Sequence, residues 1–187
     1  LEGYGYIHYG GHGYPDRIDQ GLTAEQLSRT RLSPCVVWNG ACSTGVTWRY
    51  FESEWSTGVV REKTVRAEES FCLRMLAQPV LGYFAATHPD HGVPVYQEME
   101  RLFTTGCTLG EAMKSTYDAV VIANGGERLP LLQLADGDPI PPWGPTEFML
   151  YGTASRLLYG DPTARPTEAF GEAAVEAELA GDELTLT

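Results

Sequence analysis

Basic residues are scarce in this chain. The 187 residues include 13 Lys and Arg against 25 Asp and Glu, which gives a formal net charge of −12. A chain this acidic repels a phosphate backbone on average, so nucleic acid is not an expected partner. A basic peptide is attracted instead, although net charge often serves only solubility.

Long apolar runs and metal-type cysteine pairs are also missing. No apolar run approaches the roughly 20 residues of a membrane span, and the longest, over 79–87, suits a buried strand. The four cysteines form no C-x-x-C pair, which argues against a structural zinc site, and their spacing is not that of a small disulfide scaffold. Each cysteine is therefore expected to be a core residue or a nucleophile. They are Cys35, Cys42, Cys72 and Cys107.

The residues that are present predict a folded α/β domain. Apolar residues make up 43% and charged residues 20%, as in ordinary globular domains. Strands alternate with helices, and this order predicts a mostly parallel sheet with helices on its faces. Strands are expected over 3–9, 35–39 and 79–86, and helices over 23–33, 69–77, 95–103 and 108–123. Capping boxes mark the starts of two helices, at Thr23 and Thr108.

Other segments are expected to be irregular. Loops are predicted over 14–21 and 129–145, and 48–65 is predicted to be irregular with at most a short hairpin. The mixed pattern over 147–158 indicates neither helix nor strand. The α/β domain is expected over 1–166. The tail over 167–187 alternates apolar and polar residues, which predicts a hairpin or the start of a β-rich domain.

Chemistry-bearing residues follow the predicted strands. His12 lies in the glycine-rich turn after the first strand, and Cys42 lies in a loop of small residues after the second. The carboxyl ends of parallel strands meet at one edge of a sheet, where function gathers. A cysteine thiolate attacks a carbonyl, and a neighbouring histidine can take the thiol proton and then protonate the leaving amine. The backbone N–H groups of Gly13 and Cys42 are the expected oxyanion hole.

These motifs resemble a known family. The stretch Tyr9-Gly10-Gly11-His12-Gly13, followed by Gly40-Ala41-Cys42-Ser43-Thr44-Gly45, resembles the caspase-like cysteine peptidases, with the gingipain-like branch the closest fit. Three further stretches, at 22–27, 108–112 and 158–162, resemble segments of the same branch. The resemblance spans about residues 4–166.

The resemblance implies a function and a fold. The fold is a three-layer α/β sandwich, and Cys42 is the nucleophile with His12 as general acid and base. The family's sheet has about two strands before the histidine strand, so a second chain or a preceding segment is expected to supply them. The activity implied is cleavage of peptide or protein substrates, with basic residues favoured before the cut. No cofactor is required, calcium can serve as a structural ion, and a secreted or cell-surface location is favoured.

A substrate pocket is expected near the pair. Position in the chain suggests Asp16, Glu52 and Asp90 as carboxylates for a basic side chain, and Trp48 and His88 as walls. The cluster of His88, Asp90 and His91 also has the composition of a metal site, but a pocket wall is the preferred interpretation. Of the other candidates, Asp136-Gly137-Asp138 lacks the remainder of a calcium loop. His8 shares a strand face with Tyr6, which predicts packing.

Two other functions remain open from the sequence. One is a catalytically inactive caspase-like module that binds or regulates. The other is a different α/β hydrolase that uses the loop of His88 and Asp90. An alkylation assay of Cys42 separates the first from a peptidase, and metal analysis separates the second.

Overall fold

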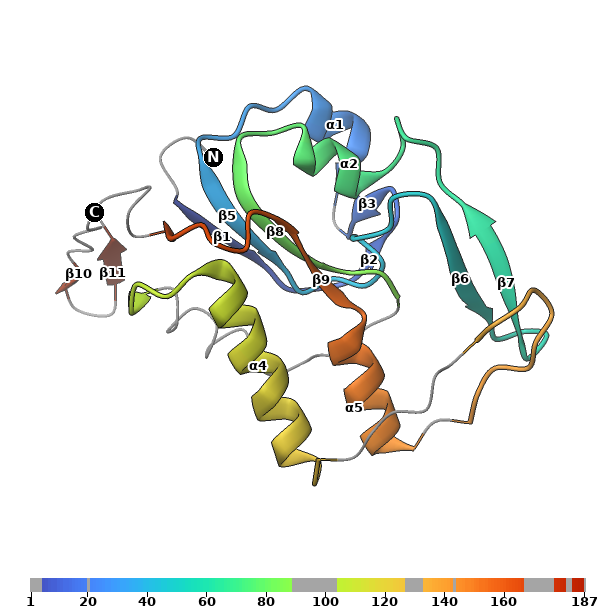
Figure 1. Ribbon diagram of the computed structural model, residues 1–187. Helices are drawn as coiled ribbons and strands as arrows, with labels where there is room; N and C mark the ends of the chain where they lie inside the picture. Colours follow the sequence, from blue (N-terminus) through green and yellow to red (C-terminus); the bar gives the residue numbers. More distant parts are fainter. Residues whose placement is uncertain are drawn as a thin grey trace.

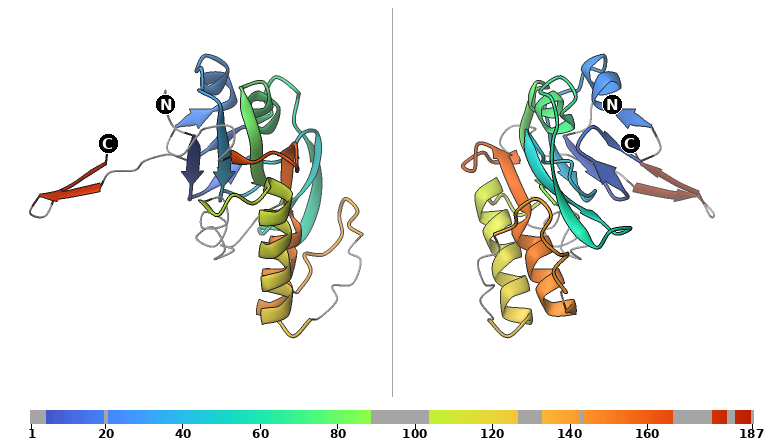
Figure 2. Two further views of the ribbon diagram at one scale, coloured as in Figure 1. Left: turned by 60° about the vertical axis from the view of Figure 1, so that its left-hand side comes forward. Right: turned by 90° about the vertical axis from the view of Figure 1, so that its right-hand side faces the viewer.

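The computed structural model describes residues 5–19, 21–88, 104–126, 133–142, 144–166, 177–180 and 183–186 (Figures 1 and 2). Its main sheet has four strands in the order β1-β5-β8-β9. The first three are parallel and β9 runs antiparallel to β8. The strands are β1 (Tyr6–Tyr9), β5 (Cys35–Asn39), β8 (Val80–Ala86) and β9 (Arg156–Gly160). The three strands expected from the sequence are confirmed where they are described.

Helices cover both faces of this sheet, which makes three layers (Figure 1). On one face, residues of α1 and α2 pack with sheet residues such as Val37 and Tyr83. On the other face, Leu109 of α4 packs with Trp38 and Phe84. The helices are α1 (Ala24–Ser28), α2 (Phe71–Leu76), α4 (Leu109–Ala123) and α5 (Pro145–Ala154). The mixed α/β class with a mostly parallel sheet is therefore confirmed.

Both predicted capping boxes are present. Thr23 Oγ1 accepts a hydrogen bond from Gln26 N at 3.1 Å, and Gln26 Oε1 accepts one from Thr23 N at 2.8 Å. Thr108 and Glu111 make the same reciprocal pair at the start of α4. These bonds satisfy N–H groups that the first turn of a helix leaves without partners, which is why the sequence signature fixes both helix starts.

The loop predicted over 14–21 is wrong in part. A small antiparallel sheet occupies this region, formed by β2 (Gly13–Tyr14), β3 (Arg17–Ile18) and β4 (Leu22–Thr23). Strands of two residues are too short to show an alternating pattern, so the sequence carries no signal for them. This sheet continues directly from the turn of His12.

The region over 48–65, predicted to be irregular with at most a short hairpin, forms a regular hairpin. Its strands are β6 (Arg49–Glu54) and β7 (Val59–Thr64). Cross-strand ion pairs, such as Arg61 with Glu54 at 3.0 Å, accompany the pairing. The segment 133–142 then lies along the outer edge of β7, with a bridge between Val59 and Pro139 (Figure 1). Val60 N donates to Asp138 O at 2.7 Å in the same contact.

The remaining segments give mixed outcomes. Residues 147–158, which had no assignment, contain most of α5 and the start of β9. The tail forms the predicted hairpin, with β10 (Ala177–Ala180) and β11 (Glu183–Leu186). The helix predicted over 95–103 lies outside the described residues. Within the described part of the chain, no helix combines the length and apolarity needed to cross a bilayer.

Candidate active site

The carboxyl edge of the main sheet brings the candidate loops together. Tyr9 at the end of β1 is in register with Asn39 at the end of β5, and Gly40 N donates to Tyr9 O at 2.6 Å. The turn of His12 and the loop of Cys42 therefore leave the sheet side by side. This is the arrangement that the order of motifs predicts.

The two loops touch at Gly13. A Cβ atom built on Gly13 would lie 2.6 Å from Ala41 Cβ and 2.7 Å from both Cys42 O and Thr44 Cγ2. No real Cβ tolerates such distances, so only glycine permits this approach. Gly13, the residue after His12, is therefore in close contact with the backbone of Cys42.

The backbone of the His12 turn is held by the small sheet that follows it. Asp19 N donates to His12 O at 2.9 Å. In an antiparallel ladder, hydrogen-bonded and non-hydrogen-bonded residue pairs alternate, so the next pair, Gly13 and Ile18, is a non-hydrogen-bonded one. The N–H of Gly13 is therefore directed away from β3. The imidazole of His12 is exposed to solvent. An exposed histidine and an N–H outside the ladder suit a site that must meet substrate.

The Cys42 loop is tied to the end of β8. Ser43 N donates to His88 O at 3.1 Å, and Gly45 N donates to Ala86 O at 2.7 Å. Ser43 has φ of +55°, a left-handed conformation that costs a non-glycine residue about 1–3 kcal/mol. Cys42 itself is half-buried. The strained turn therefore carries a partly accessible thiol.

The other three cysteines are in different environments. Cys35 and Cys72 are buried, and Cys107 is half-buried, as expected for core and helix-flank residues. Burial raises the pKa of all three thiols, to about 12 for Cys72. Because the thiolate is the reactive form, these side chains are poor nucleophiles at neutral pH.

His88 lies at the end of β8 beside the nucleophile loop. Its Nδ1 is 3.0 Å from Thr87 Oγ1, and burial lowers the pKa of its imidazole, which favours the neutral form. Asp90 and His91, its predicted partners, lie outside the described residues. Among the residues that the structure does describe, no group of three or more His, Cys, Asp or Glu side chains could hold a metal ion.

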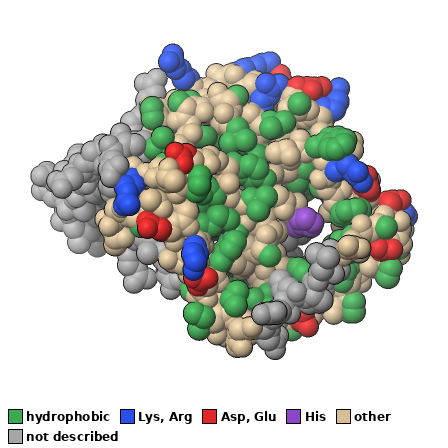
Figure 3. Space-filling view, viewed as in Figure 1, with side chains coloured by type: hydrophobic (Ala, Val, Ile, Leu, Met, Phe, Trp, Pro, Cys, Tyr) green, Lys and Arg blue, Asp and Glu red, His purple; other side chains and the backbone are tan. Residues whose placement is uncertain are grey.

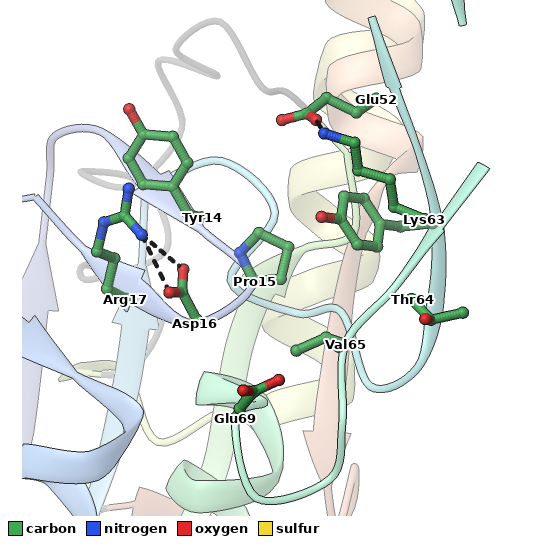
Figure 4. A pocket seen from close by; sticks show the side chains of 10 residues that line it. Tyr14, Pro15, Asp16, Arg17, Glu52, Lys63, Thr64, Val65 and Glu69 are labelled. Carbon is green, nitrogen blue, oxygen red and sulfur yellow. Dashed lines mark hydrogen bonds and ion pairs between the residues drawn. The ribbon is translucent and has the colours of Figure 1, made fainter. Parts of the chain in front are cut away.

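A pocket of about 340 Å³ opens between the small sheet and the β6–β7 hairpin (Figure 4). Two predicted substrate carboxylates, Asp16 and Glu52, line it from opposite sides, and Glu69 is a third that the sequence analysis missed. Asp16 is paired with Arg17 at 3.0 Å and Glu52 with Lys63. The small sheet on one side of the pocket follows His12 in the chain, and the β6–β7 hairpin on the other side follows Cys42.

Exposed tryptophans mark the hairpin. Trp48, a predicted cleft residue, is 64% exposed just before β6, and Trp55 in the hairpin turn is 78% exposed. Large exposed aromatics of this kind are typical of contact surfaces. Figure 3 shows a histidine side chain beside a hollow on this side of the molecule. Trp38 is buried, as expected. The ring of His8 packs on it, with 5.2 Å between the two ring centroids.

Comparison with protein-family models, curated proteins and solved structures found no match to this chain.

Proposed function

We propose that this protein is a cysteine endopeptidase with a caspase-like fold, most similar to the gingipain-like branch. The observation that carries the proposal is the contact of Gly13 with Ala41 and Cys42, which joins the turn of His12 to the loop of the half-buried thiol. The mixed α/β sheet supports it, because both motifs leave neighbouring parallel strands at the same edge.

The reaction needs only these two side chains and backbone donors. The thiolate of Cys42 forms a bond to the substrate carbonyl carbon, and the resulting oxyanion is stabilised by the N–H groups of Gly13 and Cys42. His12 protonates the leaving amine as the C–N bond breaks. Water, deprotonated by His12, then hydrolyses the thioester, and the thiol is regenerated.

The pocket between the small sheet and the hairpin is the proposed site for a basic side chain of the substrate. It is lined by three carboxylates, Asp16, Glu52 and Glu69, and each is paired with a cation of the chain, Arg17, Lys63 or Arg66, that a substrate cation would replace. Carboxylates form charge-assisted hydrogen bonds with Arg and Lys. A volume near 340 Å³ is ample for one long side chain. Trp48 and His88, predicted as walls, do not line this pocket, and we propose that they contact other parts of the substrate near the nucleophile loop.

The outer edge of β1 is where we place the remaining strands implied by the resemblance. In the described residues β1 pairs only with β5 and so ends the sheet. A second chain or a preceding segment would complete the sheet there. A secreted or cell-surface location and a structural calcium ion belong to the same proposal.

Substitution of Cys42 tests the function. The Cys42→Ala variant should lose all detectable cleavage of a peptide library containing Arg and Lys, because no other described thiol lies in a loop at the sheet edge. The matched control is Cys107→Ala, which removes another half-buried thiol before α4 and should keep full turnover. The measurement is peptide cleavage followed by mass spectrometry.

Unchanged cleavage by the Cys42→Ala variant would overturn the proposal. A wild-type protein that cleaves nothing, with a Cys42 that reacts with iodoacetamide no faster than free cysteine, would favour the binding-module alternative. A transition metal found at one equivalent in the purified protein, with activity that depends on that metal and not on calcium, would favour the alternative hydrolase.

A further inference from the structure

A buried polar network lies beneath the nucleophile loop, where the apolar strand β5 ends in Asn39. This side chain is 2% exposed. Its Oδ1 accepts a hydrogen bond from Ala41 N at 2.9 Å, and its Nδ2 donates to Tyr83 Oη at 3.0 Å. Buried polar groups of this kind are kept only when they are satisfied, so the bonds hold a defined geometry.

Tyr83, on the neighbouring strand β8, connects the network to the far end of the loop. Its ring is fully buried, and its hydroxyl donates to Thr44 O at 3.1 Å. Burial raises the pKa of the phenol, so it stays protonated and able to donate. The phenol oxygen of Tyr83 thus accepts a hydrogen bond from Asn39, before the loop, and donates one to Thr44, near the end of the loop.

A fourth hydrogen bond closes the four-residue turn from Ala41 to Thr44. Thr44 Oγ1 donates to Ala41 O at 3.1 Å. Ala41 and Thr44 are fully buried, and Ala41 packs in the hydrophobic core. The conformation of the loop, including the left-handed Ser43, is therefore held by this network on its buried side, by the backbone bonds to the end of β8 and by the contact with Gly13.

We propose that Tyr83 is a positioning residue for Cys42 and acts with Asn39 and Thr44 on the backbone of the loop. The inference rests on the proposed function of Cys42 as a nucleophile. Tyr83 touches neither substrate nor thiol in this role. It holds the backbone of the loop, and with it the position of the Cys42 thiol and N–H, because a small displacement of such groups lowers the rate by large factors.

The test compares two pairs of variants by the rate at which Cys42 reacts with iodoacetamide, located by peptide mapping. Tyr83→Phe keeps the ring and removes the hydroxyl, and its control Thr153→Val removes a buried hydroxyl from α5. Thr44→Val removes the bond from Thr44 Oγ1 to Ala41 O, and Thr44→Ser keeps the hydroxyl that makes it. A thiol paired with histidine reacts at pH 6 almost as fast as at pH 9, and a thiol without this support does not.

Tyr83→Phe and Thr44→Val should lower the ratio of the rates at pH 6 and pH 9 by roughly tenfold, which is the loss expected when the histidine no longer supports the thiolate. Thr153→Val and Thr44→Ser should match the wild type. On peptide substrates, kcat should fall by a similar factor while KM stays within about twofold, since only positioning is lost.

An unchanged ratio in Tyr83→Phe overturns the positioning role of Tyr83, whatever the result for Thr44→Val. An equal fall in Thr153→Val overturns it too, because the effect would then be a general loss of structure. If Tyr83→Phe does not fold, the Thr44 pair decides alone. A wild-type protein that cleaves no peptide refutes the peptidase proposal, while the alkylation ratio still decides the role of Tyr83.

Discussion

At the scale of single residues, Gly13 is confined by the loop it touches. An added methyl would overlap Ala41, Cys42 O and Thr44, none of which can move without shifting the loop. Gly13→Ala should therefore lower kcat by roughly a hundredfold and destabilise the protein by about 1–3 kcal/mol. Enzyme kinetics and urea unfolding measure the two effects.

The matched control for Gly13 is Gly144→Ala at the start of α5. There an added Cβ meets mainly the far end of the flexible Glu147 side chain, which can move aside. This variant should keep wild-type kcat. A Gly13→Ala protein with full activity would show that the two loops separate freely and would contradict the contact on which the site depends.

His88 gives a pH dependence of stability whose sign follows from its burial. Burial lowers its pKa below the ordinary value of 6.5, so the unfolded chain binds a proton more readily than the folded one. Stability should fall as pH drops below about 6.5, with a slope of at most ~1.4 kcal/mol per pH unit for one proton, and level off below the folded pKa.

The measurement is the free energy of unfolding in urea at several pH values from 5 to 7. His88→Gln should flatten the slope by the contribution of one group. Equal slopes in the wild type and His88→Gln would show that the imidazole titrates normally.

At the scale of elements, the β6–β7 hairpin forms one wall of the pocket and holds Glu52 there. Glu52→Gln should raise KM for Arg and Lys peptides by roughly three- to tenfold, because a carboxylate is lost and the cation of Lys63 remains. Peptides with neutral side chains at that position should keep their KM.

A surface acid provides the control for Glu52. Glu25 pairs with Arg29 on the exposed face of α1, away from the pocket, and Glu25→Gln should change neither KM nor kcat. If Glu52→Gln raises KM equally for basic and neutral peptides, the pocket does not bind the substrate side chain before the cut.

Elements differ in how far the sequence predicts them. The apolar run over 35–39 and the capping boxes at Thr23 and Thr108 predicted their strand and helix starts because those signals are local. Strand β9 and helix α5 were missed. In β9, only Arg156 is buried and the alternation is weak, so its pairing with β8 depends on tertiary contacts that no short window contains.

The candidate site was predicted to a similar extent. His12, Gly13 and Cys42 were found because glycines and small residues stand beside them. The network of Asn39 and Tyr83 was not, since a tyrosine within an apolar strand has no local mark that distinguishes it from packing. Distant hydrogen bonds are properties of the fold rather than of any motif.

At the scale of the whole molecule, the charge of −12 should assist encounters with basic substrates. Raising salt from about 10 mM to about 150 mM shortens the screening length from about 30 Å to about 8 Å. For an Arg- and Lys-rich peptide, kcat/KM should fall by roughly threefold or more, mostly through slower association. An uncharged peptide with the same cut site is the control, and equal salt dependence of the two would rule out steering.

The segment along β7 has a consequence for handling the protein at high concentration. Gly137 N and Ile140 N donate to Val60 O and Gly58 O, and Pro139, which has no N–H, occupies the bridge to Val59. The β7 edge of the hairpin is thus occupied by the chain itself around residues 58–60, which hinders another copy from adding a strand there. Edge-to-edge association of native protein would have to use another strand, and among the described strands β1, β6 and β9 each end a sheet.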